Sequence, residues 1–247
     1  MTCTSNPLVE YLKATKSLAA TEFMWRDADS HLTFTGPHAK ASFRDGDYKR
    51  RDNNVGILAV EASKLACANA LIPLTPGDAD GNWGTGSRFR RALLSLIQPS
   101  STVLDIHGMT NNHGPDVIIG TASGRAPQWL TDCTETALAN AGFVVEVRHT
   151  GPLSAGEKTL TWSLAELGHH TLQLEIASRC RQGREDPHTM TRLIAALAAT
   201  GVASSAAYST LGVVTQSLTP TASRTCYRAN TSHYTSDRVL QTYNESA

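Results

Sequence analysis

Two histidines and a glutamate lie in or just after segments that read as short buried strands. His38 follows residues 32–36, His107 follows residues 102–106, and Glu175 lies within residues 171–176. In open α/β proteins, ligands and catalytic groups lie at the carboxyl ends of the strands. We therefore expect these distant residues to meet at one edge of a sheet. These residue types suit a metal site with a carboxylate base. Such a site can catalyse hydrolysis by an activated water molecule.

The expected metal ligands are His38, His107 and one carboxylate between them in the chain. Asp52 is preferred because it stands just before an expected helix, and a helix start is a rigid place; Asp45, in the turn Asp45-Gly46, is the fallback. Three protein ligands leave a fourth position for water, whose pKa the ion lowers to about 7. Two other interpretations remain open: Asp52 as a helix N-cap, and His107 as a hydrogen-bonded histidine of the core.

Glu175 is the expected general base. In residues 171–176, alternation places Leu172, Leu174 and Ile176 on one face and Gln173 with Glu175 on the other. A carboxylate in a central strand is costly unless it is paired or used in chemistry. Beside an activated water it would accept a proton and pass it to a leaving amine. The alternative is a glutamate on an edge strand that faces solvent.

The elements that position these residues alternate between strand type and helix type. Strands are expected at 32–36, 102–106, 116–119, 143–148 and 171–176, and helices at 7–20, 56–70, 87–97, 127–141 and 187–199. This alternation predicts an α/β fold with a mostly parallel central sheet flanked by helices on both faces. We expect one metallohydrolase domain over residues 1–210. A Ser/Thr-rich C-terminal extension over residues 211–247 is expected to dock partly on it, and an assembly role for this extension is a further possibility.

Composition excludes several classes of function. The 247 residues carry 22 Lys+Arg and 22 Asp+Glu, so no net charge favours nucleic acid or an anionic membrane as partner. Five scattered cysteines without CxxC spacing argue against a disulfide framework and a cysteine zinc site. No signal peptide and no apolar run of about 20 residues are present, which predicts a cytoplasmic location. Local Lys/Arg clusters are either solvated faces or contacts for an anionic small molecule.

Taken in order, these pieces resemble the N-formylglutamate amidohydrolase family, which has a zinc-carboxypeptidase-like fold. The resemblance covers about residues 30–200. The matching pieces are Thr35-Gly36-Pro37-His38, Arg44-Asp45-Gly46 with Lys49 and Asp52, Asp80-Gly81-Asn82 before Arg88-Phe89, Leu104-Asp105-Ile106-His107-Gly108-Met109, Asp116-Val117-Ile118-Ile119-Gly120, and Leu172-Gln173-Leu174-Glu175-Ile176 with Arg179 and Arg181.

The resemblance implies a zinc hydrolase that acts on an amide bond. It places His38, Asp52 and His107 as metal ligands and Glu175 as the general base. It also places Asn82 and Arg88 where a substrate carboxylate would be held, with Arg44 as a competitor for that task, and residues 149–156 as a substrate loop. One position departs from the carboxypeptidase pattern: Ala41 stands where that pattern has a glutamate, three residues after the first histidine.

The sequence therefore predicts a zinc-dependent amidohydrolase for a small, carboxylate-bearing N-acyl amino acid of N-formyl type or a related metabolite. Another divalent metal is possible, since two histidines and an aspartate suit several ions. Two alternatives remain: a metallocarboxypeptidase or deacylase acting on a peptide or an acylated metabolite, and a non-catalytic binding protein on the same fold. The oligomeric state is left open.

Overall fold

The computed structural model describes residues 22–77 and 79–210. The strands are β1 (Phe23–Arg26), β2 (Leu32–Thr35), β3 (Ser42–Arg44), β4 (Asp47–Lys49), β5 (Asn69–Pro73), β6 (Thr102–Met109), β7 (Val117–Gly120), β8 (Val145–Arg148) and β9 (His170–Ala177). The helices are α2 (Val55–Leu65), α3 (Arg88–Leu96), α4 (Gln128–Asn140), α5 (Leu160–Glu166) and α6 (Pro187–Thr210), with short 3-10 turns η1 (Asn111–His113) and η2 (Ser178–Arg181). The expected helix 7–20 and the extension 211–247 lie outside the described residues, so the domain boundary stays a prediction.

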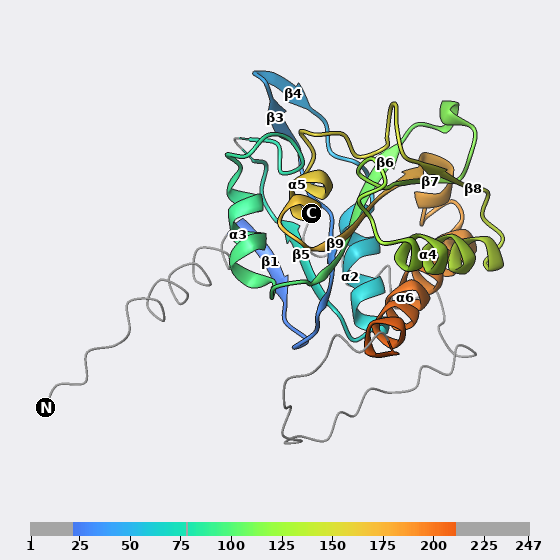
Figure 1. Ribbon diagram of the computed structural model, residues 1–247. Helices are drawn as coiled ribbons and strands as arrows, with labels where there is room; N and C mark the ends of the chain where they lie inside the picture. The colour runs from blue at the N-terminus through green and yellow to red at the C-terminus, as the bar shows by residue number, and fades with distance from the viewer. Residues whose placement is uncertain (1–21, 78, 211–247) are drawn as a thin grey trace, which may run out of the picture.

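Seven strands form one twisted sheet in the order β1-β5-β2-β6-β9-β7-β8 (Figure 1). Strands β5, β2, β6 and β9 run parallel to one another, and β7 runs parallel to β8. The pairs β1–β5 and β7–β9 are antiparallel. The expected fold class, an α/β protein with a mostly parallel central sheet, is confirmed.

Helices cover both faces of the sheet, as expected. On one face α2, α4 and α6 pack on side chains that include Phe34, Leu104 and Leu172. On the other face α3 and α5 pack on Leu71 and Val103 in a smaller apolar cluster. Strand alternation therefore places the polar residues of β6 and β9 on the second face, beyond the edge of that smaller cluster.

Most expected elements are present, but the expected helix 56–70 is wrong in its last turn. Helix α2 ends at Leu65, Cys67 turns the chain with φ of 50°, and residues 69–73 form the buried strand β5. A short apolar run has no periodicity that separates a strand from a helix end. Strand β1, the β3–β4 hairpin, β5 and helix α5 were not expected. The start of α6 is as expected, because Asp186 Oδ1 accepts the backbone N–H of Thr189 at 3.0 Å.

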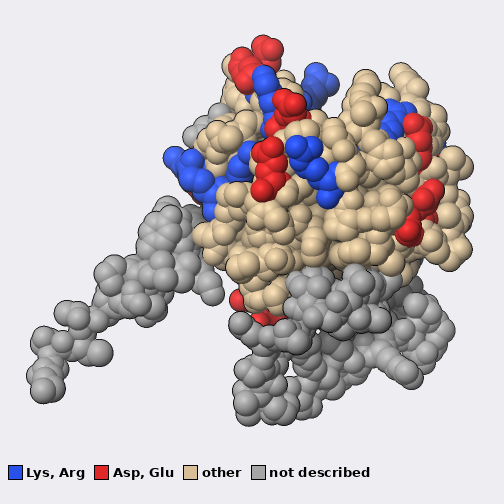
Figure 2. Space-filling view, in the orientation of Figure 1, with Lys and Arg blue, Asp and Glu red and all other residues tan. Residues whose placement is uncertain are grey.

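The surface around the β3–β4 hairpin carries cations and carboxylates side by side. Figure 2 shows Lys/Arg and Asp/Glu interspersed on this face, without one extended region of either sign. This fits the equal numbers of acidic and basic residues in the sequence. Among the described helices, none is long and apolar enough to cross a membrane. The cytoplasmic location stays a prediction.

Candidate metal centre

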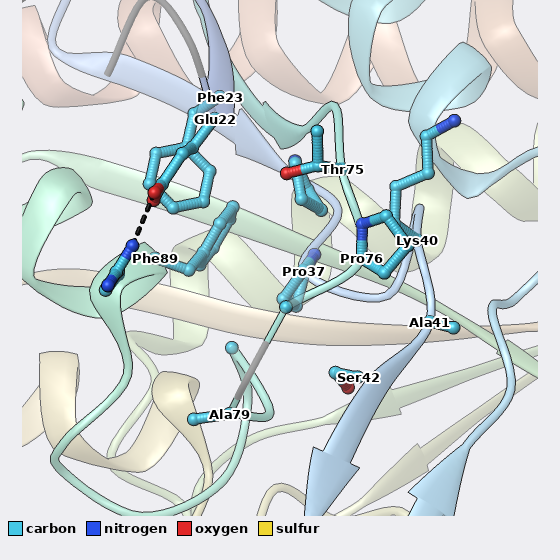
Figure 3. A pocket seen from close by; sticks show the side chains of 14 residues that line it. Glu22, Phe23, Pro37, Lys40, Ala41, Ser42, Thr75, Pro76, Ala79 and Phe89 are labelled. Carbon is cyan, nitrogen blue, oxygen red and sulfur yellow. Dashed lines mark hydrogen bonds and ion pairs between the residues drawn. The ribbon is translucent and has the colours of Figure 1, made fainter. Parts of the chain in front are cut away.

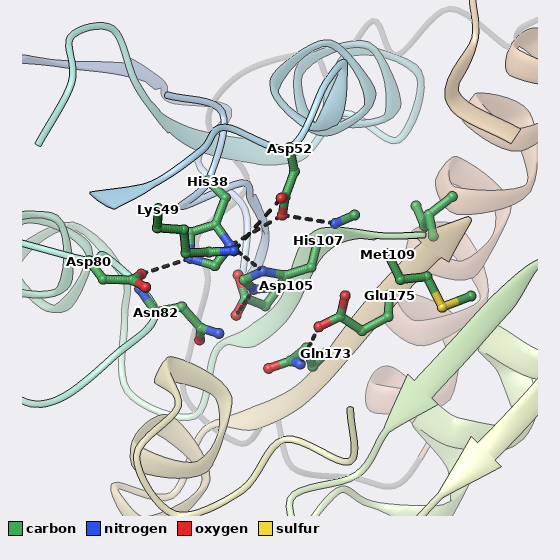
Figure 4. Close-up of polar contacts among 12 residues, drawn as sticks. His38, Lys49, Asp52, Asp80, Asn82, Asp105, His107, Met109, Gln173 and Glu175 are labelled. Atoms are coloured by element: carbon green, nitrogen blue, oxygen red, sulfur yellow. Dashed lines mark hydrogen bonds and ion pairs between the residues drawn. The ribbon is translucent and has the colours of Figure 1, made fainter. Parts of the chain in front are cut away.

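The side chains of His38, Asp52 and His107 converge at the carboxyl ends of β2 and β6 (Figure 4). His38 Nδ1 lies 2.9 Å from His107 Nδ1 and 3.2 Å from Asp52 Oδ2. One ligand atom from each of the three residues lies within 4.8 Å of the others. The structure thus brings together the three expected ligands. Both histidines are buried, and Asp52 lies at the margin of the site.

Local backbone structure directs the Asp52 side chain into this site. The Asp52 backbone N–H donates to the carbonyl of His38 at 2.8 Å, which ties the loop back to the end of β2. Its Oδ2 accepts the backbone N–H of Gly108 at 3.0 Å. The N-cap of α2 is Asn54, in the left-handed region and without a side-chain capping bond. The interpretation of Asp52 as the N-cap is therefore wrong.

Asp45, the fallback ligand, lies elsewhere. It has a left-handed backbone, with φ of 52°, in the exposed turn between β3 and β4. Its Oδ2 accepts Trp83 Nε1–H at 2.9 Å. Asp45 is not part of the His38, Asp52 and His107 group.

The outer nitrogens of both histidines are held by carboxylates. His38 Nε2 lies 2.7 Å from Asp80 Oδ1, and His107 Nε2 lies 3.0 Å from Asp105 Oδ2. An ionised carboxylate only accepts hydrogen bonds, so each Nε2 carries the proton. In a neutral ring with the proton on Nε2, Nδ1 has a free lone pair. This carboxylate–histidine arrangement is typical of metal-binding histidines, because it sets the tautomer and the ring orientation.

Two nitrogen lone pairs that face each other at 2.9 Å, with a carboxylate oxygen beside them, require a positive charge between them. That charge is a proton or a metal ion. Burial disfavours the charged form of His107, but the carboxylates of Asp105, Glu175 and Asp52 outweigh burial and raise its pKa to about 9. The surroundings therefore favour a cation at this point, and the donor set of two nitrogens and one oxygen fits zinc and several other divalent ions.

Asp52 and Asp80 stay ionised. Burial acts to raise the pKa of Asp52, but the hydrogen bond and charge of His38, together with Lys49, lower it to about 2. Burial also opposes the ionised form of Asp80, and the interactions with His38, the Asn82 backbone N–H and Arg44 hold its pKa well below its usual range. Both groups are therefore available as anions throughout the neutral range.

Each partner carboxylate is itself anchored. Asp80 Oδ2 accepts Arg44 Nε–H at 2.6 Å, and the Arg44 guanidinium lies 4.7 Å from the centre of the Trp83 ring. Asp105 accepts the hydroxyls of Thr35 at 2.7 Å and Thr161 at 3.2 Å. These contacts fix both carboxylates and, through them, both imidazole rings.

Sequence reasoning assigned no role to Asp80 or Asp105. Asp105 had a usable signal, because it precedes His107 by two residues in a strand and so shares its face. Asp80 had no signal beyond its place in the matching piece Asp80-Gly81-Asn82, because it reaches His38 from a loop 42 residues later. Tertiary structure alone brings that pair together.

Glu175 lies beside His107 on the same face of the sheet, because β6 and β9 pair in parallel with His107 opposite Glu175. Strand β9 is central, between β6 and β7, so the alternative of an edge-strand glutamate is wrong. The side chain is buried, and Glu175 Oε1 accepts Gln173 Nε2–H at 2.8 Å. A buried carboxylate next to a cation site is placed to handle a proton there.

Arg181 supports the site from beneath. Its guanidinium donates to the carbonyls of Asn53, Met109 and Ile176. It also lies so close to Gly108 that a Cβ at that position would meet its Nη2 at 2.5 Å. Burial lowers the pKa of Arg181, and the charges of Asp52 and Glu175 counteract this. Gly108 thus leaves room for the buried guanidinium of Arg181, whose charge interacts with Asp52 and Glu175.

The three candidate substrate-binding residues lie at different places. Asn82 is buried; its Oδ1 accepts the backbone N–H of Leu160 at 2.9 Å, and its backbone N–H binds Asp80. Arg44 adjoins the site through Asp80. Arg88 lies on a pocket of about 300 Å³ beyond Pro37, where it pairs with Glu22 at 2.5 Å (Figure 3). None of the three expected metal ligands lines that pocket.

Residues 149–156, the expected substrate loop, pack on β7 at Gly120. A Cβ at Gly120 would meet the Leu153 carbonyl oxygen at 2.7 Å and the Ala155 nitrogen at 2.9 Å, so only glycine permits this approach. Leu153 and Ala155 both have left-handed backbones, with φ of 66° and 63°. Gly120 is opposite Gln173 in the register of β7 and β9. The loop therefore closes the side of the site next to β9.

Comparisons with known proteins bear on the fold. No family model matches the sequence, and the search of curated proteins found no match. A crystal structure of N-formylglutamate amidohydrolase from Ralstonia eutropha JMP134 is similar, with a TM-score of 0.54 and 16% identity over 78% of this chain and 99% of that chain. A bacteriophage poly-gamma-glutamate hydrolase has a TM-score of 0.49 and 14% identity, over 81% of this chain and 97% of that chain. A metallo-carboxypeptidase from Burkholderia cenocepacia has a TM-score of 0.44 and 11% identity, over 85% of this chain and 70% of that chain. The first similarity shows a shared fold.

Proposed function

We propose that this chain is a divalent-metal hydrolase, in the first instance zinc-dependent, that cleaves the amide bond of a small N-acyl amino acid. One observation carries the proposal. Two imidazole nitrogens with their outer positions held by carboxylates converge with Asp52 beside the buried carboxylate of Glu175. The fold shared with an N-formylglutamate amidohydrolase structure supports the same class of reaction.

In this mechanism His38, Asp52 and His107 would hold the cation. When bound, a divalent ion polarises an amide carbonyl and favours ionisation of a water molecule. Glu175 accepts the proton that the water loses as its oxygen bonds to the acyl carbon. Glu175 then delivers that proton to the leaving nitrogen as the carbon–nitrogen bond breaks, so the products are a carboxylic acid and an amine.

The carboxylate of the substrate is proposed to bind near Asn82 and Arg44. The Asn82 Oδ1 is engaged by the start of α5, so its Nδ2 is the group left to donate to a ligand. Arg44 binds Asp80 through Nε, which leaves its two terminal nitrogens as further donors. Arg88 remains a proposed contact only for a substrate long enough to reach the pocket of Figure 3.

Metal analysis and a substrate panel test the proposal together. We expect about one equivalent of divalent metal per chain, loss of activity on chelation and recovery on adding the metal back. The panel compares N-formyl, N-acetyl and peptidyl amino acids, N-formyl-L-glutamate among them. Cleavage of peptidyl substrates alone would assign a carboxypeptidase, and bound metal without turnover would assign a binding protein. Protein without metal, with activity unaffected by a chelator, would overturn the mechanism.

Asp80→Asn is expected to weaken metal binding by roughly 10- to 100-fold, the usual effect of losing a group that orients a ligand. The amide no longer holds the His38 Nε2 proton with a full negative charge, so Nδ1 becomes a weaker donor. Competition with a chromophoric chelator measures the affinity. The matched control is Asp132→Asn, an exposed position on α4 on the opposite face of the sheet. Equal affinities in the two variants would mean that Asp80 does not act through His38.

A further inference from the structure

The side chain of Gln173 is buried in the middle of the site and has one unused hydrogen-bonding atom. It lies in β9 two residues before Glu175, on the same face, and is 3% exposed. Gln173 Oε1 is a buried oxygen with no hydrogen-bond partner among the described residues. Buried polar atoms are almost always satisfied, so an exception calls for an explanation.

The orientation of this amide is determined by its neighbour. Gln173 Nε2 lies 2.8 Å from Glu175 Oε1, and a flipped amide would place two oxygens against each other at that distance. Gln173 Nε2 is therefore the donor to Glu175, and Oε1 is an acceptor aimed away from it, as Figure 4 shows. The Gln173 amide therefore donates a hydrogen bond to Glu175 through Nε2 and has an unused acceptor at Oε1.

The protein offers this acceptor no donor from either neighbouring strand. On the β6 side the residue in register is Asp105, a carboxylate whose oxygens already accept from Thr35, Thr161 and His107. On the β7 side it is Gly120, which has no side chain. Neither neighbouring strand therefore satisfies Gln173 Oε1, and this acceptor is open to a donor from a molecule bound in the site.

We propose that Gln173 is a specificity-determining residue that recognises the N–H of the scissile amide. The inference rests on the proposed function. Because Glu175 delivers its proton to the leaving nitrogen, that nitrogen lies next to Glu175 and so within the neighbourhood of Gln173. A secondary amide supplies the missing donor, whereas an ester or an N-methyl amide of the same acyl group does not. A site built to bind an N–H rejects analogues that lack it, since its own buried acceptor is then left unpaired.

The test uses an N-acyl amino acid that the wild-type protein cleaves and the matching O-acyl hydroxy acid, which replaces N–H by oxygen. In Gln173→Met, kcat/KM for both substrates falls because Glu175 loses its donor. The value for the amide is expected to fall roughly tenfold further than that for the ester, as for the loss of one hydrogen bond. Gln128→Met, at an exposed position in α4, is the control and should change neither value.

Equal losses for amide and ester in Gln173→Met would overturn the inference and leave Gln173 as a residue that only positions Glu175. If that variant does not fold, the wild-type protein gives a second measurement. We expect at least a roughly tenfold lower kcat/KM for the N-methyl form of the amide than for the N–H form, and equal values would overturn the inference. If the wild-type protein, loaded with metal, cleaves no amide of the panel, the proposed function fails and the inference with it. Amide cleavage with unchanged selectivity refutes the inference alone.

Discussion

Replacing Glu175 by glutamine is expected to lower kcat by roughly 10²- to 10⁴-fold while the metal stays bound, the usual contribution of a general acid–base group. Glutamine keeps the size of the side chain but cannot accept the proton that an attacking water gives up. Metal binding is expected to be retained, because Glu175 is not one of the three residues whose ligand atoms converge. The variant therefore separates proton transfer from metal binding.

Two measurements check this result on the same protein sample. Elemental analysis should give the same metal content as the wild type, and steady-state kinetics on the best substrate of the panel should give the loss in kcat. The control is Glu135→Gln, at an exposed position in α4. A Glu175→Gln protein with near wild-type kcat would exclude Glu175 as the base, and one without metal would make it a ligand or a structural support.

Replacing His107 by alanine is expected to remove the metal. The variant loses one of the two nitrogen ligands. Losing a group that only orients a ligand weakens metal binding by up to roughly 100-fold, so losing a ligand itself should weaken it by more than that. The same change takes away the ring that Asp105 holds, although Asp105 keeps the hydroxyls of Thr35 and Thr161. We therefore expect a folded protein without metal and without metal-dependent turnover.

Chelator competition measures the affinity of the His107→Ala protein, and circular dichroism reports whether it is folded. His113→Ala is the matched control, because His113 is exposed in η1 just after the same strand. Stoichiometric metal in folded His107→Ala would contradict the proposed ligand set. If His107→Ala does not fold, His38→Ala gives the second test of the same set, since His38 supplies the other nitrogen.

Much of the site was accessible from local patterns. The expected strand 102–106 leads directly to His107, and alternation in the expected strand 171–176 places Glu175 on the polar face. Parallel pairing of β6 with β9 then makes the two residues neighbours. His38 could be placed because a glycine and a proline end its strand at the edge where ligands lie in such folds. These inferences succeed because a strand has a two-residue period and a parallel sheet has one ligand-binding edge.

Other parts depended on residues distant in the sequence. Packing between distant segments decides the order of the strands in the sheet and the antiparallel pairing of β7 with β9. It also decides that residues 69–73 form strand β5 after α2. The choice between Asp52 and Asp45 also depended on the path of one loop, since both aspartates stand near turns. Asn54 is the N-cap residue of α2, and the Asp52 side chain points toward His38 instead.

The sequence by itself determined the candidate residues: two histidines and a glutamate in or just after strands, with Asp52 or Asp45 as the carboxylate ligand, in an α/β chain without net charge. Only the tertiary structure decided which nitrogens of the histidines face each other. Asp80 and Asp105 accept hydrogen bonds from the Nε2–H groups of His38 and His107, and this leaves both Nδ1 lone pairs to a cation. The physical reason is that the residue type fixes which atoms of a side chain can donate or accept a hydrogen bond. The partners, which come from distant segments, decide which of those atoms stays available for a ligand.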